Sequence, residues 1–143
     1  MFDTIMIATD GSAHGDRALA VARSMLADHP ARLVLAHVVE LVGGKGGVVP
    51  LAADEDDLHK SLADQVEKLR ADGVDAELVT RPVHLGGPAH ALAEIADSVQ
   101  ADLIVVGSRG HSPLVEVVVG SVPIRLLHMA HRPVLVVPLD EAK

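Results

Sequence analysis

The chain has 143 residues, enough for a substantial apolar core, and we expect residues 1–143 to form a single domain. Twelve Lys and Arg residues against 20 Asp and Glu residues give a formal net charge of −8, and Phe2 is the sole aromatic residue. Because phosphate backbones need a basic face and unstacked bases need aromatic platforms, we expect no nucleic-acid partner.

Cysteine is absent, which excludes disulfide scaffolds, thiolate metal sites and cysteine nucleophiles together. The first residues, MFDTIMIATDG, lack the basic segment of a signal peptide, and charged residues interrupt every apolar run before it reaches the length of a membrane span. We therefore expect a cytoplasmic protein without a membrane partner.

Short apolar runs rich in β-branched residues recur along the chain. Near-continuous runs of this kind are typical of strands covered on both faces, as in a parallel sheet. We predict strands at residues 4–9, 33–39, 76–83, 103–106 and 134–137. Residues 41–53, which contain GGKGG, are predicted to form a surface loop.

Four segments between these runs show helical periodicity. The first follows Ser12, a common N-cap, and the second is followed by Gly73, a common stop; the fourth covers residues 121–130. The apolar stripes of the first three are Ala18, Ala22, Met25 and Leu26, then Leu58, Leu62, Val66 and Leu69, then Leu92, Ile95, Ala96 and Val99. The alternation predicts an α/β fold with an open, doubly wound, Rossmann-like sheet.

Ligands of such sheets bind beyond the carboxyl ends of the strands, where the strand order reverses. After the fourth predicted strand, Gly107 and Gly110 predict a tight turn with positive φ that lets backbone amides approach a ligand. Nine residues further on, Gly120 and Ser121 open a helix, whose first amides favour a phosphate. Further hydrogen bonds and a cation are available from Ser108, Ser121 and Arg109.

Two other strand ends carry candidate ligand contacts. Asp10 follows the first strand and is suited to a ribose hydroxyl, an adenine amino group or a metal on the phosphates, or alternatively to capping the following turn. Val38 lies near the end of the second strand, where its backbone can read an adenine edge while its side chain belongs to the core.

The pattern G107-x2-G110-x9-G120-S121 resembles the ATP-binding signature of the universal stress protein family. The opening strand with residues 9–12 (TDGS), the strand ending in His37-Val38 and the final RPVLVV resemble that family in the same order, so that the resemblance covers essentially the whole chain. It implies a five-stranded parallel sheet in the order 3-2-1-4-5 with four helices.

The resemblance also implies a homodimer joined through the last strand, Val134, Leu135, Val136 and Val137. It implies binding of ATP, ADP or AMP, with Mg²⁺ as a further candidate, and a nucleotide-dependent role in the stress response. The nucleotide-binding residues implied are Ala8, Thr9, Asp10, Val38, Gly107, Ser108, Arg109, Gly110, Gly120, Ser121 and Val122.

Two residues depart from the family pattern. Pro123 stands where relatives often have Ser or Thr, so a hydroxyl and an amide that can meet the terminal phosphate are missing. Glu116 lies within the glycine-rich segment and repels phosphates unless it faces solvent or Mg²⁺ intervenes. These departures predict either that ATP binds weakly or that AMP or ADP is a sufficient ligand.

Other chemistries lack their motifs. The nine histidines show no HExxH or three-ligand spacing, so we predict no metal-binding residues, and no set of catalytic residues is identifiable. GGKGG is not a P-loop, because no Ser or Thr follows its lysine. The acidic run at residues 54–57 is predicted to be structural, since it opens a helix. A nucleotide-independent dimerisation module and a slow ATPase remain as alternative functions.

Overall fold

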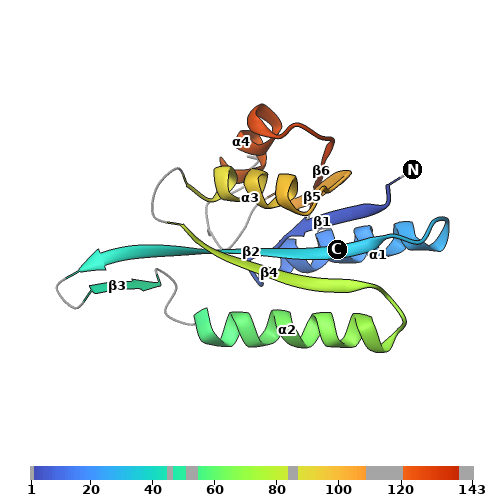
Figure 1. Ribbon diagram of the computed structural model, residues 1–143, viewed down its shortest axis with the longest axis horizontal. Coiled ribbons are helices and arrows are strands. Elements are labelled where there is room, and N and C mark those ends of the chain that lie inside the picture. Colours follow the sequence, from blue (N-terminus) through green and yellow to red (C-terminus); the bar gives the residue numbers. More distant parts are fainter. Residues whose placement is uncertain (1, 45–46, 51–54, 84–86, 109–120, 139–143) are drawn as a thin grey trace, which may run out of the picture.

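A computed structural model describes residues 2–44, 47–50, 55–83, 87–108 and 121–138. Strands and helices alternate along most of this length, as the apolar periodicity predicts (Figure 1). The strands are β1 (Thr4–Ala8), β2 (Arg32–Gly44), β3 (Gly47–Pro50), β4 (Ala76–Val83), β5 (Leu103–Gly107) and β6 (Val134–Val137). The helices are α1 (Ala13–Ser24), the short 3-10 helix η1 (Met25–Ala27), α2 (Glu55–Ala71), α3 (Gly87–Ser98) and α4 (Ser121–Met129).

Five parallel strands form the main sheet in the order β4-β2-β1-β5-β6. Counted along the predicted strands, this order is 3-2-1-4-5, and the expected doubly wound α/β fold is confirmed. The chain moves outward from β1 in one direction to β2 and β4, then returns to the other side of β1 with β5. The strand order therefore reverses between β1 and β5, where a crevice is expected at the carboxyl ends.

Alternate residues of the buried strands supply the two cores on either face of the sheet. Ile5 and Ile7 point to the core shared with α1 and α2, whereas Met6 and Ala8 point to the core shared with α3 and α4. Figure 1 shows α3 and α4 above the sheet and α2 below it. Because both faces are covered, the central strands β1 and β5 are apolar along nearly their whole length, which is why their sequence shows runs rather than alternation. None of the helices described here is long and apolar enough to cross a membrane.

The prediction of a loop at residues 41–53 is wrong for part of its length. β2 continues to Gly44, and its last four residues pair antiparallel with β3, from Leu41 opposite Pro50 to Gly44 opposite Gly47. Figure 1 shows this β2–β3 hairpin extending away from the sheet at the left. The backbone hydrogen bonds of an antiparallel pair stabilise this segment although its glycines have low strand propensity.

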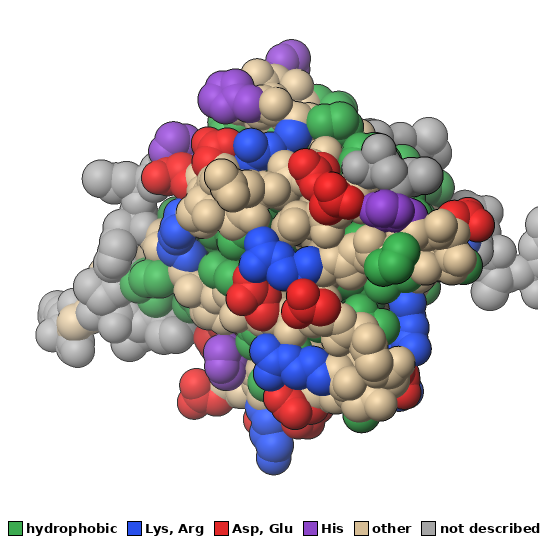
Figure 2. Space-filling model, turned by 45° about the vertical axis from the view of Figure 1, so that its right-hand side comes forward, with side chains coloured by type: hydrophobic (Ala, Val, Ile, Leu, Met, Phe, Trp, Pro, Cys, Tyr) green, Lys and Arg blue, Asp and Glu red, His purple; other side chains and the backbone are tan. Residues whose placement is uncertain are grey.

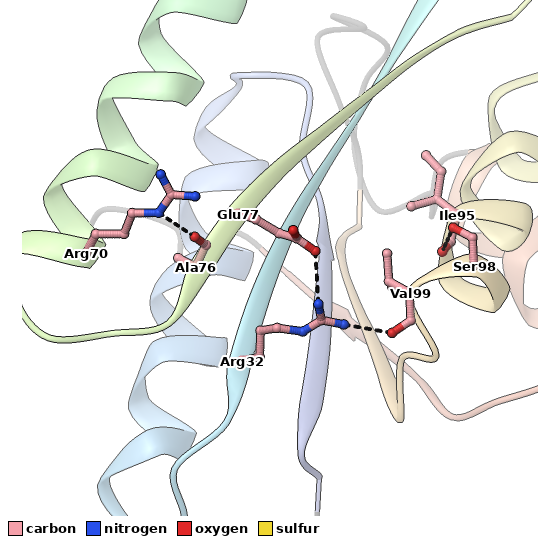
Figure 3. Close-up of polar contacts among 7 residues, drawn as sticks. All are labelled: Arg32, Arg70, Ala76, Glu77, Ile95, Ser98 and Val99. Atoms are coloured by element: carbon pink, nitrogen blue, oxygen red, sulfur yellow. Dashed lines mark hydrogen bonds and ion pairs between the residues drawn. The ribbon is translucent and has the colours of Figure 1, made fainter.

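Arginine side chains hold the amino-terminal edge of the sheet, opposite the crevice (Figure 3). Arg32, the first residue of β2, donates to a carboxylate oxygen of Glu77 on β4 at 3.1 Å and to the carbonyl of Val99 at 2.8 Å. Arg70 of α2 donates through Nε to the carbonyl of Ala76 at 2.7 Å. These bonds tie α2, β2, β4 and the end of α3 together and leave the carboxyl-terminal edge to the candidate site.

Candidate functional site

A cavity of about 330 Å³ lies at the carboxyl ends of β1, β2 and β5, where the strand order reverses. This volume falls within the range of small-molecule sites. Its walls are mainly apolar, with a few polar and charged groups among them. The lining residues are Ala8, Thr9, Asp10, Gly15, Ala36, His37, Val38, Glu40, Glu55, Leu58, Pro88, Leu92, Val106, Gly107, Val122 and Pro123.

The turn between β1 and α1 is fixed by its own side chains. Thr9 accepts a hydrogen bond from the Gly11 amide at 3.2 Å, and Asp10 accepts one from the Ser12 amide at 3.0 Å. Ser12 in turn caps α1 by accepting from the Gly15 amide, which confirms its predicted N-cap role. Asp10 therefore caps the turn and lines the cavity at once, so the two interpretations of this carboxylate are compatible.

Gly107 lies at the cavity for a reason that differs from the predicted one. It is the last residue of β5 and lacks the positive φ expected of it. A Cβ there would lie 2.7 Å from the Cβ of His14 and 2.8 Å from its carbonyl oxygen. The absence of a side chain therefore permits close packing of α1 on β5, and the prediction of a left-handed turn at Gly107 is wrong.

The first turn of α4 lies at the cavity. The helix begins at Ser121 as predicted, and Val122 and Pro123 line the cavity. The first amides of a helix have no partner within the helix, and together with the positive end of the helix dipole they favour an anion. Pro123 contributes no amide, so fewer donors are available here than at a helix start without proline.

One side chain pair joins two walls of the cavity. His37 of β2 places Nε2 2.6 Å from a carboxylate oxygen of Glu55, the first residue of α2. Its Nδ1 lies 3.2 Å from the carbonyl oxygen of Thr9. The His37 side chain is 5% exposed and that of Glu55 13%, so the pair is largely removed from water. It connects the end of β1, the middle of β2 and the start of α2.

The charged residues that line the cavity are mostly acidic. Asp10, Glu40 and Glu55 are carboxylates, His37 is the one titratable base, and no Lys or Arg occurs among the described lining residues. By contrast, the face of the molecule in Figure 2 shows basic and acidic side chains interspersed. The described walls therefore suit the uncharged, hydrogen-bond-donating end of a ligand better than several phosphates.

Six of the predicted nucleotide-binding residues line this cavity, namely Ala8, Thr9, Asp10, Val38, Gly107 and Val122. Ser108 and Ser121 are described but are not among the lining residues. Arg109, Gly110 and Gly120 lie outside the described residues, as does Glu116.

Some lining residues from α2 and α3 were not predicted from the sequence. Glu55 was assigned to the acidic start of a helix, yet it pairs with His37 across the cavity. The available signal was His37 itself, a titratable residue within the apolar run LVLAHVV that needs a partner once buried. Leu58, Pro88 and Leu92 carry no comparable signal, because an apolar residue facing a cavity has the same pattern as one facing a core.

Histidines elsewhere pair with carboxylates on the surface. His90 lies 3.1 Å from Glu94 on α3, and His29 lies 2.8 Å from Asp3. In the part of the chain that the structure describes, no three His, Asp or Glu side chains are placed to hold a metal ion.

Related sequences match nearly the whole length of this chain. The sequence profile of the Universal stress protein family matches residues 1–138. A universal stress protein of Thermus aquaticus, encoded in the QAH/OAS sulfhydrylase 3′ region, is 38% identical over 140 residues, covering 96% of this chain and 99% of the relative. Universal stress protein YxiE of Bacillus subtilis is 32% identical over 150 residues, covering 96% and 99%.

Solved structures give the same result. A universal stress protein in complex with cAMP is 28% identical with a TM-score of 0.69, covering 97% of this chain and 99% of that one. A universal stress protein from Archaeoglobus fulgidus in complex with dAMP shares the fold at 23% identity and a TM-score of 0.63, covering 95% and 97%. The chain described here belongs to the universal stress protein family.

Proposed function

We propose that this protein binds an adenine nucleotide in the cavity between β1, β2 and β5 and acts as a nucleotide-dependent regulator in the cytoplasmic stress response, with residues 1–143 as one domain. This proposal rests on one observation. Residues that the sequence predicts at three strand ends and at the beginning of one helix all line the same cavity of about 330 Å³. A 28% identical structural relative in complex with cAMP supports the ligand class.

The proposed pose follows from the chemistry of the walls. The base lies among Val38, Leu58 and Leu92, where the Val38 backbone is the expected partner of its edge. The Asp10 carboxylate accepts from a ribose hydroxyl, and the phosphate meets the start of α4 at Val122. Ser108, Arg109, Gly110, Gly120 and Ser121 complete the proposed phosphate site.

The described walls fit a nucleoside with one phosphate better than a triphosphate. Three carboxylates line the cavity and Pro123 provides no amide, so each added phosphate meets further repulsion there. We therefore propose AMP or a cyclic nucleotide as the preferred ligand. Binding of ATP then depends on Arg109 or on Mg²⁺ to offset the added charge.

A charge placed at the start of α4 tests the pose. Val122→Glu sets a carboxylate where the phosphate is proposed, and we expect the Kd for AMP to rise about tenfold or more. The matched control is Leu127→Glu on the same helix, because Leu127 is 57% exposed. Titration calorimetry measures both, and thermal unfolding checks that each variant is folded.

Equal AMP affinity in the folded Val122→Glu variant and the wild type would contradict the phosphate position. Purified protein offers a second test, because a chain without Trp or Tyr absorbs little at 280 nm. A band near 260 nm that elutes as an adenine nucleotide after heating supports the proposal. No heat with AMP, cyclic AMP or ATP in the presence of Mg²⁺ would instead favour a nucleotide-independent interaction module.

A further inference from the structure

Three carboxylates are among the described lining residues of the cavity, and two of them have partners within the protein. Asp10 accepts a hydrogen bond from the Ser12 amide. Glu55 lies 2.6 Å from Nε2 of His37. Glu40, the third, has neither a hydrogen-bond nor an ion-pair partner among the described residues. Because an ionised carboxylate only accepts hydrogen bonds, Glu40 offers an acceptor to a ligand in the cavity.

The strand that carries Glu40 fixes its position at the mouth of the cavity. Glu40 is paired with Val83 at the end of the ladder between β2 and β4, and the antiparallel pairing of β2 with β3 begins at Leu41. Its backbone is therefore held between two ladders of hydrogen bonds, although its side chain is exposed. A ligand meets this carboxylate on a backbone that is already ordered, which lowers the cost of binding.

The backbone of β2 presents a donor and an acceptor beside this carboxylate. β1 and β2 are joined as far as the bond from the Thr9 amide to the Ala36 carbonyl, at 3.0 Å. Alternate residues of a parallel strand turn their N–H and C=O toward the same neighbouring strand, so those of Val38 face the side on which β1 has ended. Val38 lines the cavity, and the edge of a base can therefore pair with its backbone.

Glu40 adds a second acceptor on the same face of β2 as Val38, about 6.6 Å further along the strand. The exocyclic amine of adenine has two hydrogens, of which the Val38 carbonyl accepts one. The second hydrogen is left for the Glu40 carboxylate. Hypoxanthine and guanine carry a carbonyl oxygen in place of this amine, and that oxygen offers no hydrogen and is repelled by a carboxylate.

We propose that Glu40 is a specificity-determining residue, which selects a purine with this exocyclic amine over a purine with the carbonyl. The inference rests on the proposed function and adds a contact with the base. Arg81, opposite Val38 on β4, is a cation on the same face of the sheet. A role of Glu40 limited to balancing that charge would affect all nucleotides alike, whereas the proposed role depends on the base.

The experiment compares cyclic AMP with cyclic IMP, which differ in the base and carry the same phosphodiester charge. Titration calorimetry at neutral pH gives the Kd of each. For wild type we expect cyclic AMP to bind about tenfold or more tightly, because cyclic IMP leaves the acceptors of the site unpaired. Glu40→Gln provides an amide that can donate to the carbonyl of the base. We expect it to reduce the ratio of the two Kd values about fivefold or more.

The ratio separates recognition of the base from overall charge. Removing a carboxylate from the cavity strengthens the binding of both anionic nucleotides, and their equal charge makes this effect cancel in the ratio. The discrimination due to the Val38 backbone is present in both proteins and cancels as well. The matched control is Glu94→Gln on α3, which removes an exposed carboxylate outside the cavity lining and is expected to keep the wild-type ratio. Thermal unfolding checks that both variants are folded.

The outcomes separate the two proposals. Equal binding of the two nucleotides by the wild type, or a ratio that is unchanged in Glu40→Gln, would overturn the assignment of Glu40 and leave nucleotide binding intact. A ratio that falls equally in Glu94→Gln would overturn it too. Absence of binding of either nucleotide would overturn the proposed function and, with it, this inference. A ratio that falls in Glu40→Gln alone supports both.

Discussion

The absence of a side chain at Gly107 is explained by the packing of α1 against β5, without reference to a ligand. The His14 backbone lies so close that an added Cβ would sit 2.8 Å from its carbonyl oxygen. Gly15 is similar, since a Cβ there would lie 2.5 Å from the Thr9 hydroxyl. Both glycines allow the start of α1 to approach the strand ends, which in turn shapes the cavity. A glycine that the sequence predicts to bind a ligand is therefore also required by the packing of α1 on β5.

Gly107→Ala is expected to lower the free energy of unfolding by about 1–3 kcal/mol, because backbone must move to admit the methyl group. The matched control is Gly43→Ala in β2, where nothing lies within 4 Å of the added Cβ and we expect a change within about 0.5 kcal/mol. Urea unfolding followed by circular dichroism measures both. Similar midpoints for the two variants would show that α1 adjusts to the methyl group at little cost.

At the scale of the elements, the start of β1 depends on a carboxylate that lies 99 residues further along the chain. Asp102, just before β5, accepts hydrogen bonds from the backbone amides of Asp3 and Thr4, both at 2.9 Å. The amides of Thr4 and Asp3 hold the pKa of Asp102 below its ordinary value of 3.8. This contact aligns β1 with β5 at the edge of the sheet away from the cavity.

Because the folded pKa of Asp102 is depressed, the stability it provides is present above its unfolded pKa and is lost as the pH falls through the folded value. We expect Asp102→Ala to melt a few degrees below wild type at neutral pH, and the difference to shrink as the pH is lowered below 3.8. Asp28→Ala, which removes another exposed carboxylate, serves as the control. A difference in melting temperature that is independent of pH would contradict the role of the carboxylate charge.

Elements that are stabilised by burial of their own apolar residues could be predicted from the sequence. Features that are stabilised by pairing with another segment were harder to predict. The strand Ala76–Val83 and the strand Val134–Val137 have the predicted bounds. The β2–β3 hairpin was missed because its glycines indicate a loop, although apolar pairs flanking GGKGG are also a hairpin pattern. At the site, Glu55 was missed since its partner lies 18 residues away and its position was already explained by the helix dipole.

The assembly of whole molecules is expected to involve β6. It lies at one end of the described sheet, next to β5, and its first three residues are only partly buried although all are apolar. An apolar edge strand of this kind readily pairs with another strand. We propose that β6 pairs with β6 of a second copy, which would extend the sheet across both subunits.

Light scattering coupled to gel filtration tests this assembly. We expect a mass of twice 14.9 kDa at micromolar concentration. Val136→Asp places a charge in the middle of the edge and is expected to shift the mass toward that of one chain, whereas Glu94→Gln on α3, away from β6, is expected to leave it unchanged. A wild-type mass of 14.9 kDa would exclude pairing through β6 at that concentration.

The central place of β1 has a consequence for synthesis on the ribosome. One edge of β1 pairs with β2 soon after it is made, but the other waits for β5, which begins at Leu103. At about 5–20 residues per second, that edge stays open for roughly five to twenty seconds. The nascent chain therefore carries an incomplete sheet for most of its elongation, and no shortened product ending before β5 can form the cavity.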